Sequence, residues 1–243
     1  MVAPSRKKRL PRSKYNKEEI VEIFKRFKMQ RPEPKGELNH VNPFTLVVAV
    51  ALSAQATDAG VNRATEVLFK VADTPEKMLA LGEEKVREYI KTIGLYRNKA
   101  KNVIALSEKL IEDFNGEVPT TREELVQLPG VGRKTANVVL SMAFGQATMA
   151  VDTHILRIGK RMGLAPADKP DDVEQILLRT IPDEYLYHAH HWLILHGRYT
   201  CTARLPKCET CIVADICKYK GKTNDIAYPI EPIEEQIIPV AGS

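Results

Sequence analysis

Residues 128–136 read LPGVGRKTA, and this stretch decides how the rest of the chain is interpreted. Gly130 and Gly132 enclose a single valine, Val131, and a helical pattern follows directly. Glycine adopts backbone angles that other residues resist, and it lets a partner approach the main chain closely. The pattern predicts two helices joined by a tight hairpin. The N–H groups at the start of the second helix could hold a phosphate, although an ordinary helix connection would use the same residues.

Lys134 stands near the start of the helix that follows the hairpin. The N-terminus of a helix carries a positive partial charge, which disfavours an ammonium and favours the neutral, nucleophilic amine. A neutral lysine can attack the anomeric carbon of a sugar and form a Schiff base. The alternative is that Lys134 simply pairs with a phosphate.

Asp152 follows in the stretch ATMAVDTH, residues 147–154, just before another predicted helix. It occupies an N-cap position, where a carboxylate accepts a backbone N–H. It could also face Lys134 across a cleft, where it would stabilise an oxocarbenium ion or move protons. Sequence spacing does not decide between these roles.

The periodicity of the chain is helical nearly throughout, which predicts an all-α fold. Asn16 with Glu19 and Thr120 with Glu123 are typical of capping boxes at helix starts. A helix that opens at Asn42-Pro43 is apolar all round and should be the most buried. Further helices are predicted from Thr74-Pro75 and over residues 97–115, 133–144, 153–162, 171–179 and 184–195.

Charge is unevenly distributed along the 243 residues, whose net charge is a mild +5. The first 17 residues hold seven basic side chains and no acid, and the last 18 hold three acids and no base. We expect a disordered basic arm over 1–15 and a flexible tail over 226–243. The apolar runs are too short for a membrane span, and a secretory signal is not expected. We therefore expect a reducing intracellular compartment, cytoplasmic and nucleoid-associated.

The cysteines cluster near the C-terminus as Cys201, Cys208, Cys211 and Cys217, with the spacing C-x6-C-x2-C-x5-C. Four thiolates within 17 residues satisfy either one zinc ion or a [4Fe–4S] cluster. Zinc sites usually pair two C-x2-C units, and this sequence has one. Disulfides are not expected in a chain of this size and compartment.

LPGVGRKTANVVL and AVDTHILR together resemble the helix-hairpin-helix DNA glycosylases, in particular the endonuclease III family. The resemblance extends from about residue 16 to 220 and includes VALSAQATD, IKTIGLY and HHWLILHGRYTC. It implies a six-helix barrel over 36–147 that carries the hairpin. It also implies an iron–sulfur cluster subdomain over 16–35 and 148–225, with Lys134 and Asp152 on opposite walls of a lesion pocket.

The activity that the resemblance implies is a bifunctional DNA glycosylase and abasic-site lyase of base excision repair, acting as a monomer on duplex DNA. Lys134 would be the Schiff-base nucleophile and Asp152 the second catalytic residue. An oxidised pyrimidine would be flipped out of the stack and removed, and β-elimination would cut the strand 3′ to the site. The alternative from another class is a non-catalytic DNA-binding module that recognises damage.

The resemblance also assigns contacts with DNA. Gln55 and Leu95 would fill the gap that the flipped base leaves, and Gly130, Val131 and Gly132 would hold phosphate. Arg204 and Lys207 would reach phosphate from the loop within the cysteine cluster, where Leu205 replaces a residue that is often basic. The cysteine spacing matches that of the family, so a [4Fe–4S] cluster with a structural and DNA-positioning role is expected.

Overall fold

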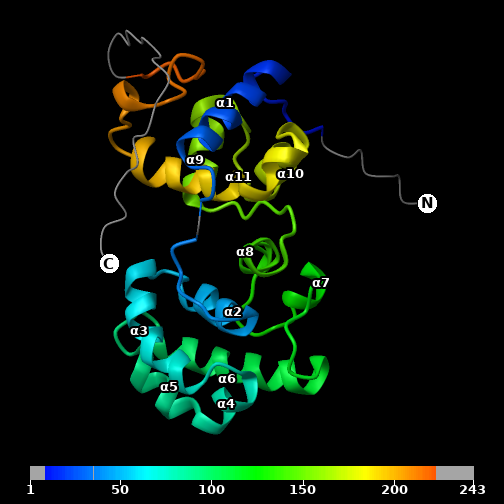
Figure 1. The fold of residues 1–243 in the computed structure, drawn as a ribbon, viewed down its shortest axis with the longest axis vertical. Helices are drawn as coiled ribbons and strands as arrows, with labels where there is room; N and C mark the ends of the chain where they lie inside the picture. The colour runs from blue at the N-terminus through cyan, green and yellow to red at the C-terminus, as the bar shows by residue number, and fades with distance from the viewer. Residues whose placement is uncertain (1–8, 35, 223–243) are drawn as a thin grey trace, which may run out of the picture. The chain divides into compact units, whose positions relative to one another are not determined.

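The computed structural model describes residues 9–34 and 36–222, and every regular element in these ranges is helical (Figure 1). The predicted all-α class is therefore confirmed. The predicted tail and the first eight residues of the predicted arm lie outside the described residues. The chain divides into two compact units, with boundaries after Pro34 and after Ala150. Nowhere in the described ranges does a helix combine the length and apolar character that a bilayer crossing needs.

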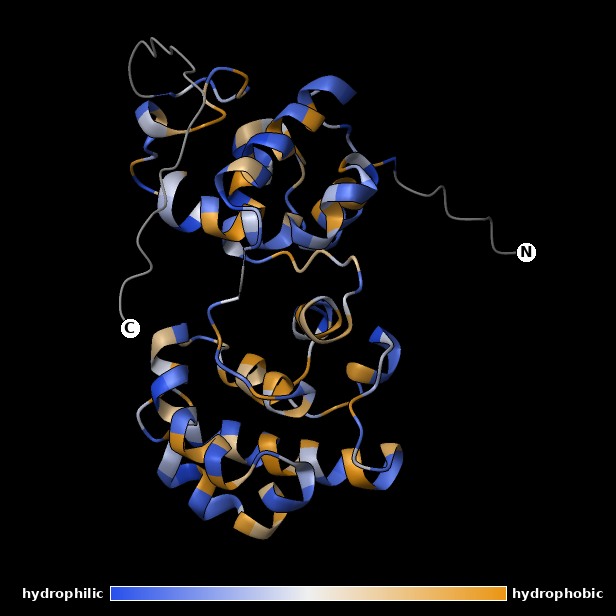
Figure 2. Cartoon of the chain, in the orientation of Figure 1, coloured by the Kyte–Doolittle hydropathy of each residue, from blue (hydrophilic) through white to orange (hydrophobic). Residues whose placement is uncertain are grey.

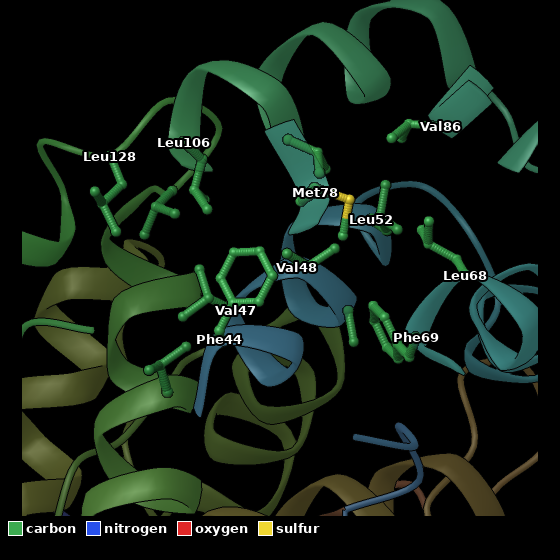
Figure 3. Packing of buried hydrophobic residues seen from close by; sticks show 14 of the residues in the cluster. Phe44, Val47, Val48, Leu52, Leu68, Phe69, Met78, Val86, Leu106 and Leu128 are labelled. Carbon is green, nitrogen blue, oxygen red and sulfur yellow. The ribbon is translucent and has the colours of Figure 1, made fainter. Parts of the chain in front are cut away.

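The unit that begins after Pro34 is built around α2, a helix whose side chains are buried on nearly all sides. Asn42 caps α2 by accepting the N–H of Thr45 at 2.8 Å, and Pro43 occupies the first turn, as the sequence predicts. Figure 3 shows Phe44, Val47, Val48 and Leu52 of α2 among the side chains of the core. The helices of this unit are α2 Pro43–Leu52, α3 Asp58–Val71, α4 Pro75–Leu81, α5 Glu83–Ile90, α6 Tyr96–Phe114, α7 Arg122–Leu125 and α8 Arg133–Phe144.

Hydropathy explains why α2 is central. Its residues are almost uniformly apolar in Figure 2, whereas α3, α5 and α6 have apolar and polar faces. A helix that is apolar all round is stable only when neighbours surround it. α8 packs against α2, and Val138 of α8 joins Leu46 and Val50 of α2 in a second small cluster that also includes Ala150.

The other unit joins the described residues up to Pro34 to those from Val151 onward. Phe24 of α1 packs against Tyr185 and Trp192 of α11, with ring centroids 6.1 and 6.4 Å apart. Trp192 Nε1 also donates a hydrogen bond to the carbonyl of Arg31 at 2.7 Å. The elements of this unit are α1 Lys17–Gln30, α9 Thr153–Ile158, α10 Pro170–Thr180, α11 Asp183–Leu195, two π-helical turns at Gly159–Gly163 and His196–Thr200, and a 3-10 turn at Cys208–Thr210.

The predicted helix starts agree with the structure to within one residue, and the cap of α7 is one that is shifted. Asn16 and Glu19 form the predicted capping box of α1. The cap of α7 is Thr121, whose side chain accepts the N–H of Glu124, and not Thr120. Both threonines have a glutamate three residues later, so the pattern was ambiguous by one residue. Thr120 has another role, because its carbonyl accepts a hydrogen bond from Gln146 Nε2 at 2.8 Å.

One predicted helix is shorter than expected. The pattern predicted a helix over residues 153–162, but α9 ends at Ile158 and continues as the π-helical turn Gly159–Gly163. Gly163 has φ +92° and terminates the turn. Its carbonyl accepts the N–H of Lys14, which ties the segment before α1 to this turn.

Candidate functional site

The hairpin that the sequence predicts is present between α7 and α8. Gly130 has φ +79°, and Val131 donates its N–H to the carbonyl of Leu128 at 3.0 Å. The side chains of Leu128 and Val131 are buried in the core, which fixes the turn against the helices. Two features therefore favour glycine at position 130: the positive φ, and the side chain of Asn102, which would lie 3.2 Å from a Cβ there.

Gly132 has a different role. Its φ of −93° is ordinary, and it forms the N-cap of α8 without any side-chain capping hydrogen bond. A Cβ at this position would meet no atom within 4 Å. No side chain therefore caps the N–H groups in the first turn of α8. Uncapped N–H groups at a helix N-terminus are the groups that bind anions.

Lys134 is the second residue of α8, directly after this uncapped turn. The residue is exposed, and its ammonium has neither a hydrogen bond nor an ion pair with any residue that the structure describes. A reagent in solvent can therefore reach this lysine.

Asn137, one turn after Lys134, ties the segment that leads to Asp152 onto α8. Asn137 is buried, and its carbonyl accepts the hydroxyl of Thr148 at 2.5 Å. Its Nδ2 donates to the carbonyl of Met149 at 3.4 Å. The chain is therefore held on α8 as far as the end of this unit, two residues before Asp152.

Asp152 forms the N-cap of α9 in the other unit. One carboxylate oxygen, Oδ1, accepts the N–H of Ile155 at 2.8 Å. The residue is half-buried, and its second oxygen has no hydrogen-bond partner among the described residues. The capping role suggested by the sequence is confirmed, and it leaves one oxygen for chemistry.

Gln55 and Leu95 are brought together by the fold although 40 positions separate them. Gln55 lies in the turn after α2, and Leu95 is the N-cap of α6. Both are exposed, Leu95 to 59%, so neither side chain is part of the core. Both line one cavity of about 170 Å³, which Gly130 of the hairpin also lines.

The four cysteines converge in the other unit and line one common pocket. Cys201, Cys208 and Cys211 are each 8% exposed, Cys217 is half-buried, and none of the four forms a disulfide. No group of three or more His, Cys, Asp or Glu side chains in the described ranges is arranged to hold a single metal ion.

The chemistry around these sulfurs suits a metal centre with several irons. Burial raises the pKa of the Cys211 thiol to about 12 and also raises the pKa of Cys217. Thiolates in such surroundings need a positive centre to compensate for the lost hydration. Arg161 supports the ligand positions, because its guanidinium donates to Cys201 Sγ at 3.6 Å and to the carbonyl of Thr202 at 2.6 Å. The residues therefore fit an iron–sulfur cluster held by four cysteines.

The wide gap between Cys201 and Cys208 forms an exposed loop. Lys207 closes it by donating its N–H to the carbonyl of Thr200 at 2.9 Å. Arg204 and Lys207 are exposed, and Leu205 is 70% exposed at the same loop. The loop therefore presents two cations and one apolar side chain to solvent.

Sequence reasoning missed Lys99, a residue of α6 that is 7% exposed. The helical spacing contained the signal, since residues 99, 103, 106 and 110 lie on one face and the last three are buried and apolar. Sequence reasoning also missed Asn137 and Arg161. Their partners are backbone carbonyls and a sulfur from distant segments, which no local pattern shows.

Family models match the chain in two places. Residues 48–183 match the model described as HhH-GPD superfamily base excision DNA repair protein. The chain belongs to this superfamily. Residues 201–217, from the first to the last cysteine, match the iron-sulfur binding domain of endonuclease III.

Individual relatives extend the similarity over most of the chain. Endonuclease III of Escherichia coli is 54% identical over 209 residues, which covers 86% of this chain and 99% of that protein. Endonuclease III of Bacillus subtilis is 53% identical over 195 residues, with 80% and 89% covered. A solved structure of a trapped endonuclease III–DNA covalent intermediate, an estranged-adenine complex, is 45% identical with a TM-score of 0.78. It covers 84% of this chain and 96% of the solved chain.

These matches confirm the predicted family, the helix-hairpin-helix glycosylase fold and the iron–sulfur domain. They also confirm the predicted enzyme class, a bifunctional DNA glycosylase and abasic-site lyase of base excision repair.

Proposed function

We propose that this member of the superfamily removes oxidised pyrimidines from duplex DNA through Lys134, and that Asp152 assists. The observation that carries the proposal is the position of Lys134, exposed and without an ion pair among the described residues, on the uncapped first turn of α8. A nucleophilic amine must be accessible and must spend part of its time without a proton. One related structure is a trapped endonuclease III–DNA covalent intermediate, which supports covalent chemistry of this kind.

The chemical steps follow from an amine that attacks a sugar. Lys134 Nζ bonds to C1′, and the glycosidic bond breaks with its electron pair leaving on the base, which takes up a proton. The amine loses a proton, the bond between C1′ and O4′ breaks with its electron pair leaving on O4′, and O4′ takes up a proton, which gives a protonated Schiff base between Nζ and C1′. Loss of the acidified C2′ proton then expels the 3′ phosphate by β-elimination, and hydrolysis of the Schiff base restores the amine.

Asp152 has one oxygen fixed in the cap of α9 and a second oxygen without a partner among the described residues. We assign the second oxygen to the substrate, where its charge would stabilise the positive character that C1′ develops as the base leaves. The cap hydrogen bond holds the carboxylate in one orientation, so that little reorganisation is needed when charge forms.

DNA contacts are proposed for three surfaces. Gln55 and Leu95 would enter the duplex where the base has left, because an amide can hydrogen-bond the unpaired base and an apolar side chain can replace lost stacking. The N–H groups around Gly130, Val131 and Gly132 would bind phosphate without reading sequence. Arg204 and Lys207 would bind phosphate from the loop in the cysteine cluster, and Leu205 adds no charge there.

We assign the four cysteines to a [4Fe–4S] cluster, which would supply rigidity and charge to the loop between Cys201 and Cys208 and no chemistry on the nucleobase. Cys201, Cys208, Cys211 and Cys217 would hold it, and Arg161 would position Cys201 through its contact with Sγ. We further propose that the protein acts as a monomer in a reducing cytoplasmic compartment.

Borohydride trapping tests the proposal. Duplex DNA with one oxidised pyrimidine is incubated with the protein and sodium borohydride, which reduces the Schiff base to a stable adduct. The wild-type protein and a Lys25→Ala control, altered at an exposed residue of α1, should form the adduct. Lys134→Ala should bind the duplex and form none. Binding without any adduct in the wild-type protein would instead identify a non-catalytic DNA-binding module.

A further inference from the structure

Lys99 is a buried cation without a described partner. The residue is 7% exposed, and its Nζ has no hydrogen-bond partner within the described residues. Burial lowers the pKa of this lysine. Leaving an ammonium unpaired in such a place is unfavourable, so its retention calls for a compensating group.

Lys99 lines the cavity of about 170 Å³ that Gln55 and Leu95 also line. The lining contains no Asp or Glu, so no carboxylate among the described lining residues balances the lysine. Besides these residues, the wall is made by Ala51, Leu52, Ala54, Asn98, Asn102, Val103 and Gly130. The cavity therefore combines one cation with three amide side chains, which can donate and accept, and it has apolar sides.

The start of α6 adds a second positive element at the same place. α6 has 19 residues, and its N-cap, Leu95, makes no side-chain capping hydrogen bond. Tyr96, Arg97 and Asn98 form its first turn, where backbone N–H groups have no partner within the helix. A long helix with an uncapped first turn favours an anion at that end.

We propose that this cavity is a phosphate site for the DNA strand that runs past Gln55 and Leu95, with Lys99 and the first turn of α6 as its donors. The proposal rests on the proposed function in that DNA is the ligand and that its strand passes Gln55 and Leu95. A phosphodiester suits the cavity better than a base, because the ammonium and the helix N–H groups are all donors and no carboxylate opposes an anion. Gly130 joins the cavity to the hairpin, so one strand could contact both.

The site explains how the strand would be held while Gln55 and Leu95 enter the duplex. Lys99 would donate to a phosphate oxygen, and the phosphate would in turn neutralise the buried ammonium. Lys99 is thus a positioning residue and takes no part in bond breaking. Its contact should appear in the electrostatic part of DNA binding, which salt titration measures.

The main test compares Lys99→Met with Lys101→Met, because Lys101 is an exposed lysine two positions further on the same helix. Both variants lose one charge. Binding to a duplex with a stable abasic-site analogue is measured by fluorescence anisotropy over a range of salt concentrations. Lys99→Met should weaken binding roughly tenfold and reduce the salt slope by about 0.9, as expected for one lost phosphate contact, while Lys101→Met changes neither. A folded Lys99→Met with wild-type affinity and slope would overturn the proposal.

A second variant covers the case in which Lys99→Met fails to fold. Asn98→Asp places a carboxylate on the exposed first turn of α6, where the helix end favours negative charge. This variant should be at least as stable as the wild type and should bind DNA more weakly, because its carboxylate repels the phosphate. Unchanged DNA affinity in this variant would count against the site.

Neutral methylphosphonate linkages distinguish a phosphate from a base. Replacing phosphates one at a time should reveal one position that weakens the wild-type protein and has no further effect on Lys99→Met. If the loss in Lys99→Met instead depends on the base opposite the lesion, the ligand is a base edge and the phosphate assignment is wrong. Adduct formation by Lys134 is scored separately, so a failure of the proposed chemistry leaves this result interpretable.

Discussion

Gln55 and Leu95, which line the same cavity, both adopt the left-handed backbone conformation, with φ of 55° and 58°. Among described non-glycine residues, Asn115 at the end of α6 is the one other case. Non-glycine side chains rarely occupy this region, and strain of this kind concentrates at functional sites. Both residues are exposed, so core packing does not account for the conformation.

We predict that stability and activity move in opposite directions at these two positions. Gln55→Gly and Leu95→Gly relieve the left-handed strain and should keep or raise the free energy of unfolding by up to about 1 kcal/mol. The same changes remove the groups that enter the duplex, so cleavage of lesion DNA should fall by at least about tenfold. Thermal unfolding and single-turnover kinetics measure the two effects. Loss of stability with unchanged cleavage would show that the side chains serve the fold.

Two substitutions of Asp152 can separate its role as the N-cap of α9 from the role of its negative charge. Asp152→Asn keeps an oxygen that can accept the N–H of Ile155, so stability should change little, whereas loss of the charge should reduce base removal strongly. Asp152→Ala also loses the cap and should cost about 0.5–2 kcal/mol in addition. Denaturant unfolding and glycosylase assays on both variants check this. Full activity in Asp152→Asn would restrict the residue to capping.

Lys99 should make the free energy of unfolding depend on pH in the alkaline range. Because the pKa of Lys99 is lowered in the folded protein, the unfolded chain binds more protons between that lowered value and about 10.4. The free energy of unfolding of the wild-type protein should therefore increase as pH rises through that window, because the cost of burying a charged Lys99 disappears. Lys99→Met should be more stable than wild type near neutral pH, and its advantage should shrink toward pH ~10. A difference that stays constant with pH would mean that Lys99 titrates alike in both states.

Stable retention of iron in the cysteine pocket should require all four cysteines and Arg161. Cys208→Ser should lose iron and the visible absorbance of the cluster, and the unit that carries it should unfold at lower temperature. Arg161→Met should retain the four sulfurs but lose iron faster to a chelator, since the guanidinium no longer holds Cys201. Iron analysis and absorbance time courses measure both. Arg161→Lys, which keeps the charge, should lie between wild type and Arg161→Met.

Much of the fold was predictable because it rests on local patterns. The capping pair Asn16 and Glu19 and the proline at the start of α2 placed helix starts correctly, and the apolar run of α2 predicted its burial. The cap of α7 was misplaced by one residue because Thr120 and Thr121 carry the same local signal. The pairing of α1 with α11 could not be read from any local pattern.

By itself, the sequence determined which residue types are available and where helices begin: a lysine after a glycine hairpin, an aspartate at a cap, and four cysteines at the spacing of an iron–sulfur site. Caps, glycine conformations and helical periodicity depend on a few neighbouring residues, so short stretches of sequence predict them. Only the tertiary structure decided that Gln55, Leu95, Lys99 and Gly130 line one cavity, and that Lys99 is buried there without a described partner. Burial and the meeting of distant loops depend on how α2, α6 and the hairpin pack, which short stretches of sequence do not encode separately.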